Sequence, residues 1–185
     1  GIVTYEIVPQ KDPKKEKVSY TINMGTPYYL DSIVWMKYPT RADSIIQATR
    51  KQSVLKKGDN FSVIKLEEER QRLSSLLRNN GYYYFRSDLT TFRADTLQKP
   101  GYVSLQVVPQ AGLPSEAKKQ YYMGNTSVYL TGYNGEQPTD SLKLPSMTIY
   151  YHGDKPGIRP GTLARNFFYR KGELFSQDRQ TFTQE

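Results

Sequence analysis

The sequence predicts an α+β fold built from tandem modules, each with the element order β-α-α-β-β. Three observations lead to this prediction. Short segments alternate apolar and polar residues with the period of a β-strand. Between them, residues 62–78 have the apolar spacing of an amphipathic helix, followed by a glycine stop. Several short patterns also recur later in the chain in the same order, as in a repeat.

Residues 1–25 are predicted to form a β-hairpin. Apolar side chains alternate with polar ones in residues 3–7 and again in residues 18–24, and a polar turn at residues 10–16 separates the two strands. A lone two-stranded hairpin is marginally stable in water. We therefore expect residues 1–25 to be the last two strands of a preceding module.

A complete module is predicted for residues 26–110. Its first strand spans residues 28–36 and stops at Pro39. A helix over residues 41–54 follows, and its start has capping-box form, with Thr40 three residues before the acidic Asp43.

The second helix of this module follows a turn at Gly58, and Ser62 is the predicted N-cap. Glu68 and Arg72, four residues apart, are expected to pair on its exposed face. Gly81 is the predicted left-handed C-cap. The apolar stripe, interrupted at Arg70, consists of Val63, Leu66, Leu73, Leu76 and Leu77.

Two strands are predicted to close the module. The first runs over residues 82–92, where the aromatic run Tyr82–Phe85 favours a strand. Its core-facing rings would be Tyr83 and Phe85, or else Tyr82 and Tyr84, because side chains alternate across a strand. A turn at 95–101 and a strand over residues 102–108 follow.

Residues 111–185 are predicted to begin a further module. Residues 120–123 (Gln-Tyr-Tyr-Met) resemble residues 27–30 (Pro-Tyr-Tyr-Leu), and Lys171–Ser176 resembles Lys57–Ser62. The expected elements are a strand near residues 121–133 and a helix over 162–169, with a second helix starting where the chain stops, at 181–185. We therefore expect this module to lack its closing hairpin.

An insertion at residues 134–161 separates the first strand of this last module from its first helix. It is rich in glycine and proline, which predicts a structured loop. Within it, residues 147–151 (Met-Thr-Ile-Tyr-Tyr) are a candidate for an extra strand that pairs back on the module.

The second helix and its flanks resemble a known family. Lys57-Gly58-Asp59-Asn60-Phe61, Leu66, Glu69-Arg70, Arg72-Leu73, Leu76-Leu77-Arg78, Gly81-Tyr82-Tyr83 and Phe85 are similar to a POTRA domain. POTRA domains are the periplasmic modules of BamA- and TamA-type outer-membrane assembly factors, and the abundance of tyrosine, sixteen in 185 residues, resembles Bacteroidetes members of this surface-antigen family. The resemblance implies tandem modules, each with a three-stranded mixed sheet packed against two helices.

The resemblance also implies a function. It places the chain at the periplasmic face of the outer membrane, in a protein that assembles or inserts outer-membrane proteins. The implied partners are unfolded outer-membrane protein clients, accessory assembly proteins and the protein's own C-terminal outer-membrane β-barrel. The implied role is docking, without catalysis or cofactors. Within the family, the alternatives are a secretion transporter and a division protein.

The residues themselves contain no constellation for catalysis or metal binding. Cysteine is absent and His152 is the only histidine, so a zinc site lacks ligands. Glu67, Glu68 and Glu69 point about 100° apart on a helix and do not converge on a substrate. No phosphate-binding glycine loop and no long apolar run occurs. We predict no enzyme activity, no metal and no cofactor.

A net charge of +8 leaves a nucleic-acid-binding module as the alternative from another class. Tyr82–Tyr84 beside Arg86 have the ingredients of a platform that stacks bases. In a strand, however, only every second ring would face a ligand, so we do not expect nucleic acid as a partner.

The predicted protein-binding site is an edge strand. In POTRA-like sheets the strand after the second helix lies at an edge, which the resemblance implies here for residues 83–92. An edge strand exposes unpaired backbone groups and accepts an added strand from a partner. The residues assigned to this site are Tyr83, Phe85, Ser87, Leu89 and Thr91.

Overall fold

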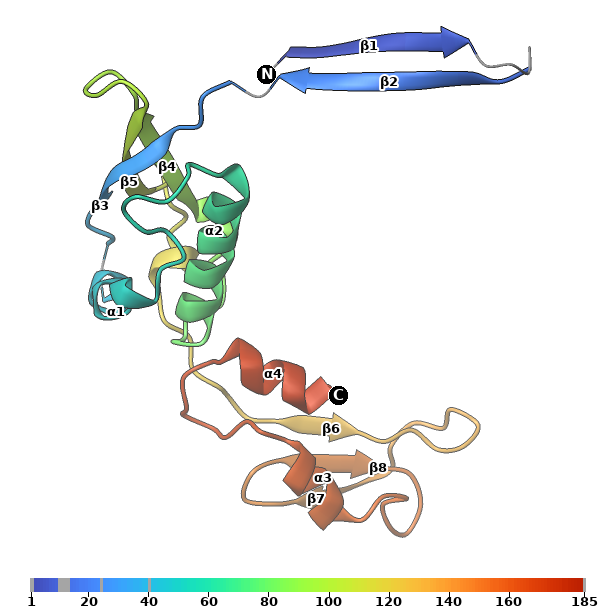
Figure 1. Ribbon diagram of the computed structural model, residues 1–185. Helices are drawn as coiled ribbons and strands as arrows, with labels where there is room; N and C mark the ends of the chain where they lie inside the picture. The colour runs from blue at the N-terminus through green and yellow to red at the C-terminus, as the bar shows by residue number, and fades with distance from the viewer. Residues whose placement is uncertain (1, 10–13, 24, 40, 185) are drawn as a thin grey trace.

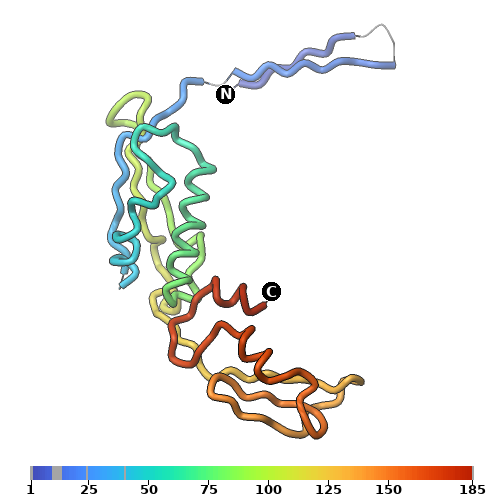
Figure 2. Tube along the Cα trace, turned by 60° about the horizontal axis from the view of Figure 1, so that its bottom comes forward, coloured from blue at the N-terminus to red at the C-terminus, as the bar shows by residue number. Residues whose placement is uncertain are grey.

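The computed structural model describes residues 2–9, 14–23, 25–39 and 41–184. Three sheets follow one another along the chain in an open curve (Figures 1 and 2). We call residues 2–23 the N-terminal hairpin, residues 29–109 the central unit and residues 120–184 the C-terminal unit. None of the described helices combines the length and apolarity that crossing a bilayer requires.

The N-terminal hairpin consists of β1 (Ile2–Pro9) and β2 (Glu16–Asn23), paired antiparallel. The register places Val3 opposite Ile22, Tyr5 opposite Tyr20 and Ile7 opposite Val18, so the apolar side chains share one face. All of them are exposed. The predicted hairpin is confirmed, although residues 10–13 of its turn lie outside the described residues.

The sheet of the central unit has the order β3-β5-β4, with β5 (Tyr102–Pro109) in the middle. β3 (Tyr29–Trp35) is parallel to β5, and β4 (Thr90–Asp95) is antiparallel to it. The sheet is therefore mixed, as expected. Along β5, Val103, Leu105 and Val107 are buried while Gln106 is exposed, which is the alternation of a strand with one face on a core.

Two α-helices complete this core. α1 (Ala42–Ala48) contributes Ile46, and α2 (Val63–Arg78) contributes Leu73 and Leu77, all fully buried. The prediction of one helix over residues 41–54 was too long. The chain leaves α1 after Ala48, continues as the 3₁₀ turn η1 (Arg50–Gln52), and reaches α2 through a segment that turns at Gly58.

Several predicted details of the helices need correction. Thr40 of the capping box lies outside the described residues, and the Asp43 carboxylate accepts the N–H of Tyr38 at 3.0 Å. Ser62 is the residue before α2, but its hydroxyl makes no capping hydrogen bond. Val63 is exposed, whereas Leu66 at the end of the same turn packs against the core.

The charge pairing on α2 also differs from the prediction. Arg72 pairs with Glu69, three residues before it, at 2.6 Å rather than with Glu68. Glu69 is fully buried, and its other oxygen accepts the N–H of Val54 at 3.0 Å. This carboxylate therefore bonds α2 to the segment that connects it with α1. Arg70, at the gap in the apolar stripe, lies over the ring of Phe92.

The C-terminal unit has the same strand order as the central unit, β6-β8-β7. β6 (Ser127–Tyr129) is parallel to β8 (Thr148–Tyr151), and β7 (Asp140–Lys143) is antiparallel to β8. The extra strand expected at residues 147–151 is thus present. The insertion supplies a hairpin that pairs with β6 in the order that β4 and β5 have with β3.

The helices of the C-terminal unit start earlier than predicted. α3 spans Pro160–Asn166 and α4 spans Gln177–Gln184, against predicted starts at residues 162 and 181. Proline at the first position of α3 needs no N–H partner, and the repeat of the Lys57–Ser62 pattern places α4 directly after Ser176, as α2 follows Ser62.

The repeat predicted from the sequence recurs as one set of backbone hydrogen bonds. In the central unit, the N–H groups of Leu30, Gly58 and Phe61 donate to the carbonyls of Asp59, Leu30 and Tyr28 at 2.7–2.8 Å. In the C-terminal unit, the N–H groups of Met123, Gly172 and Phe175 donate to the carbonyls of Glu173, Met123 and Tyr121 at 2.8–2.9 Å. Gly58 and Gly172 both have positive φ, so each turn requires a left-handed residue.

Candidate protein-binding edge

β4 lies at an edge of the central sheet. Among the described residues its strand neighbour is β5, and the register runs from Thr90 opposite Pro109 to Asp95 opposite Ser104. The strand is six residues long and carries no proline. A partner strand can add along this edge only if N–H and C=O groups of β4 point away from β5.

The register identifies those outward groups. The carbonyl of Leu89 accepts the N–H of Gln110 on the β5 side at 2.9 Å. Because backbone groups of successive strand residues point to opposite sides, Thr91, Arg93 and Asp95 also point toward β5. Phe92 and Ala94 therefore direct both their N–H and C=O groups away from the sheet.

The opposite edge of the sheet is less accessible. The outward groups of Leu30 on β3 are taken by the turn at Gly58 and Asp59, at 2.7 and 2.8 Å. Tyr29 also forms an isolated antiparallel bridge with Asn60. Along the described part of β3, the beginning of the edge is thus covered by the chain itself, and β4 is the better candidate for strand addition.

The predicted strand over residues 82–92 was wrong in its first eight residues. A reverse turn, in which Phe85 N–H donates to the Tyr82 carbonyl at 3.0 Å, leads into the 3₁₀ helix η2 (Ser87–Leu89). Tyr82, Phe85 and Leu89 are the buried side chains, so neither predicted alternation of rings occurs. The spacing of three and four residues between these side chains is that of helical turns. This spacing was the feature of the sequence that argued against a strand.

The predicted site residues consequently have different surroundings. Phe85 and Leu89 are in the core, Ser87 lies in η2, and Tyr83 contacts the C-terminal unit. Of the five, Thr91 alone lies on β4. Sequence reasoning missed Phe92 and Ala94, because the choice between the two sides of the strand depends on which residues bond to β5.

The start of β4 is anchored by a buried hydrogen bond. The Tyr38 hydroxyl donates to Thr90 Oγ1 at 3.0 Å, and both residues are almost completely buried. Desolvation by burial raises the pKa of Tyr38 to about 12. The hydrogen bond with Thr90 opposes this rise, and the negative charge of Glu69 adds to it. The strand is therefore held by a neutral phenol at physiological pH.

Other candidate chemistry finds no support in the geometry. His152 is exposed, and its Nδ1 lies 3.0 Å from the Gln137 carbonyl. Glu67 contacts Arg70 and Gln71, while Glu69 is buried elsewhere on the same helix. The described residues contain no group of three or more side chains able to hold a metal ion.

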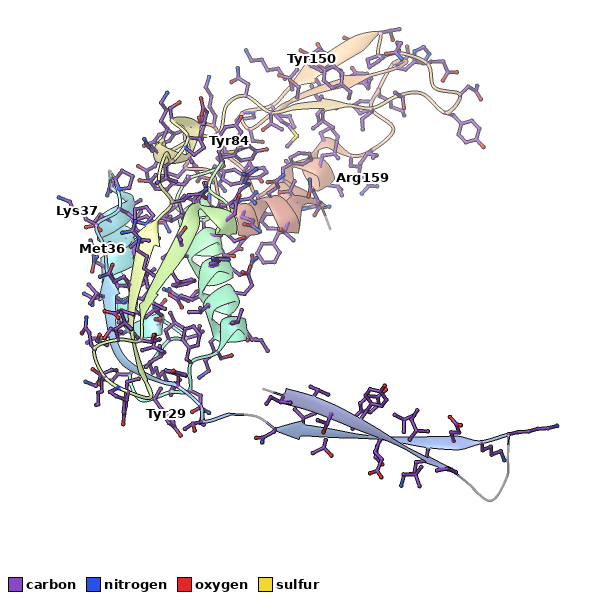
Figure 3. All side chains as sticks on the ribbon, turned by 90° about the horizontal axis from the view of Figure 1, so that it is seen from above. Tyr29, Met36, Lys37, Tyr84, Tyr150 and Arg159 are labelled. Atoms are coloured by element: carbon purple, nitrogen blue, oxygen red, sulfur yellow. The ribbon has the colours of Figure 1, made fainter. Side chains whose placement is uncertain are left out.

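The aromatic run considered for nucleic acid is engaged within the protein. Tyr82 is buried, and the rings of Tyr83 and Tyr84 meet edge to face at 4.8 Å. Tyr84 also meets Tyr121 edge to face at 5.2 Å. Figure 3 shows Tyr84 where the central unit meets the C-terminal unit. Tyr83 and Tyr84 remain partly exposed, but they meet edge to face and do not lie parallel on one face as successive stacking rings would.

The central sheet is mixed, has the order β3-β5-β4, and has two helices between β3 and β4 in the chain. This is the topology of a POTRA domain. The structure of BamA POTRA3-5 from Haemophilus influenzae is similar to this chain, with a TM-score of 0.53 and 11% sequence identity. The match covers 97% of this chain and 57% of the Haemophilus chain. This likeness shows that the chain has the POTRA fold, over little more than half the length of the matched structure.

Two cyanobacterial structures also resemble the chain. The N-terminal domain of Omp85 from Thermosynechococcus elongatus is 14% identical, with a TM-score of 0.28, and the match covers 98% of this chain and 62% of that one. POTRA1-3 of the periplasmic domain of Omp85 from Anabaena is 15% identical, with a TM-score of 0.25 and the same coverages. No protein-family model and no curated protein sequence matches the chain.

Proposed function

We propose that this chain is part of the periplasmic POTRA region of an outer-membrane protein assembly factor, and that it docks extended segments of unfolded outer-membrane proteins or accessory partners. The POTRA fold and the resemblance of the second helix to BamA- and TamA-type proteins support this proposal. We further propose that residues 1–25 close a preceding module, that 26–110 form a whole module, and that 111–185 belong to a following one. The repeated turn geometry supports this division.

The open edge of β4 is the observation that carries the docking proposal. A client segment adds antiparallel or parallel to β4 and bonds to the outward groups of Phe92 and Ala94. Main-chain bonds do not require a particular client sequence, which suits a protein with many clients. Arg93 and Asp95 keep the free edge charged, so that it does not pair with other copies of the chain.

Substitution of Ala94 tests this mode of binding. Ala94→Pro removes one outward N–H without removing a ladder bond to β5, a change that edge strands accept. Ala94→Val is the matched control, because it keeps the N–H and favours a strand. The probe is a ten-residue peptide that alternates Val or Tyr with Thr or Lys and carries one photoreactive benzoylphenylalanine.

We expect the peptide to cross-link to residues 90–95 in the wild type and in Ala94→Val. Its affinity for Ala94→Pro should fall about tenfold, since one net hydrogen bond and the approach of the partner backbone are both lost. Equal capture by a folded Ala94→Pro variant would exclude β4 as the docking strand. Cross-links that map to the described part of β3 would assign the opposite edge instead.

A further inference from the structure

The central and C-terminal units meet at the end of α2. The helix ends in a Schellman motif, in which Tyr82 N–H donates to the Leu77 carbonyl at 3.0 Å and Gly81 N–H to the Arg78 carbonyl at 3.4 Å. Gly81 has φ +93°. This turn brings the Asn79–Gly81 corner out of the central unit and toward the start of the C-terminal unit (Figure 1).

The corner contacts the C-terminal unit through its backbone. The Gly81 carbonyl accepts the N–H of Tyr121 at 2.8 Å, and the Asn80 carbonyl accepts Gln120 Nε2 at 2.8 Å. A side chain at Gly81 would displace Leu174, because a Cβ there would lie 2.7 Å from Cδ2 of that residue. The end of α2 is thus in direct contact with residues 120 and 121 at the start of the C-terminal unit and with Leu174 further along it.

The side chain of Asn79 contacts the first turn of α4. Its Oδ1 accepts the N–H of Asp178 at 3.0 Å and the hydroxyl of Ser176 at 3.2 Å, and its Nδ2 donates to Asp178 Oδ2 at 2.9 Å. The first N–H groups of a helix have no partner within the helix, and a side-chain oxygen normally supplies one from the preceding residue. Here Ser176, the residue before α4, accepts the N–H of Arg179 at 3.5 Å, and Asn79 adds a second oxygen from another unit, about a hundred residues earlier in the chain.

An aromatic cluster lies beside this contact. Tyr83 meets Phe175 edge to face at 4.8 Å, and Tyr84 meets Tyr121 at 5.2 Å. Phe175 is buried, and it belongs to the turn that precedes α4. The Asn79 hydrogen bonds and the Tyr83–Phe175 contact therefore hold the same segment, residues 175–178, against the end of α2, while the Tyr84–Tyr121 contact holds the start of the C-terminal unit.

We propose that Asn79 is a helix cap supplied in trans and that it holds the central and C-terminal units in one fixed orientation. The cap is directional, since it requires the first turn of α4 to face the end of α2. The bonds to the Asn80 and Gly81 carbonyls prevent sliding along the connection, and the Tyr83 and Tyr84 rings resist rotation about it. The orientation of the two units is then a property of this joint.

Spin-label distance measurements test this joint, and the absence of cysteine from the sequence makes site-specific labelling direct. Labels at Glu68→Cys on α2 and Ser141→Cys on β7 occupy exposed positions in the two units. The wild-type background should give one narrow distance distribution. Asn79→Ala should lose this narrow peak, and the amide of Asp178 should exchange faster with solvent.

Asn80→Ala is the matched control. It removes a neighbouring amide that bonds to the Leu76 carbonyl within its own helix, at 2.8 Å, and its backbone carbonyl still accepts from Gln120. It should retain the narrow peak. The exchanged pair Asn79→Asp with Asp178→Asn should also retain it, because the carboxylate introduced at position 79 still accepts the N–H of residue 178, and the side-chain bond re-forms with donor and acceptor reversed.

Three outcomes would overturn the proposal. One is a broad distribution in the wild-type background, which would show that the units move independently. Another is a narrow peak in Asn79→Ala that equals that of Asn80→Ala. The third is loss of the peak in Asn80→Ala as well as in Asn79→Ala, which would assign the effect to unfolding of the end of α2, and circular dichroism of both variants identifies that case.

Discussion

Gly81 meets two requirements at one position. Its φ of +93° is a left-handed conformation that a residue with Cβ adopts at a cost, and its missing side chain leaves room for Leu174 of the C-terminal unit. Gly58 meets only the first requirement, since a Cβ built there has nothing within 4 Å. The comparison of these two glycines separates backbone strain from contact between units.

Gly58→Ala should lower the free energy of unfolding by about 1–2 kcal/mol through left-handed strain alone. Gly81→Ala should lower it further, because Leu174 must also move away from the end of α2. Thermal melts of both variants measure the difference. A Gly81→Ala variant that melts at or above the wild-type midpoint would contradict the assignment of Gly81 as the C-cap.

Tyr38 makes stability sensitive to high pH. Its pKa is raised to about 12 in the folded protein, against about 10 when exposed, so between these values the unfolded chain loses a proton that the folded chain retains. The stabilisation is complete below pH 10 and is lost as pH rises toward 12. The full effect is about 2–3 kcal/mol.

Tyr38→Phe should remove this part of the pH dependence. The variant is less stable at neutral pH, since Thr90 loses its buried donor, but its stability should fall less steeply than that of the wild type between pH 10 and 12. Denaturant melts at several pH values measure both slopes. Parallel slopes for the two proteins would show that Tyr38 ionises in the folded state as it does in water.

At the scale of elements, α2 organises the central unit through its last two turns. Leu73 and Leu77 are fully buried, whereas Val63 at its start is 72% exposed. Glu69 and Arg70, between these ends, fasten the helix to the α1–α2 connection and to Phe92 on β4. The helix therefore buries its apolar side chains most completely in its second half, and Val63 at its start contributes little to the core.

Truncation of the buried leucines tests this description. Leu73→Ala or Leu77→Ala should lower the free energy of unfolding by about 2–5 kcal/mol, because each leaves a cavity in a packed core. Val63→Ala, as the control, should change it by less than about 0.5 kcal/mol. Denaturant unfolding measures all three, and a wild-type midpoint for either leucine variant would mean that the helix faces the sheet with another side.

At the scale of the whole molecule, the three sheets differ in how far their apolar faces are buried. Among the described residues, the central sheet carries a large buried core, and the sheet of the C-terminal unit carries a smaller one around Met147, Ile149 and Tyr151. The apolar face of the N-terminal hairpin is exposed throughout. Val18, Tyr20 and Ile22 repeat the positions of Val103, Leu105 and Val107, which α1 and α2 cover in the central unit.

Local patterns were sufficient to predict much of this protein from its sequence. The period of two predicted β1, β2 and β5, the run between two breakers predicted β3, and the glycine at position 81 predicted the end of α2. The recurrence of the Lys57–Ser62 pattern predicted a second turn of the same geometry at Lys171–Ser176. These features depend on backbone conformation and on side chains within a few residues, so they are readable without a partner.

Tertiary structure alone decided the features that join distant residues. Tyr82–Phe85 favours a strand locally, but the core accepts Tyr82, Phe85 and Leu89 from a turn, and Tyr83 and Tyr84 contact the next unit instead. The outward side of β4 depends on its register with β5, and the partner of Asn79 lies 99 residues away. No local propensity contains this information, because the free energy that selects these arrangements arises from contacts that form only when the chain has folded.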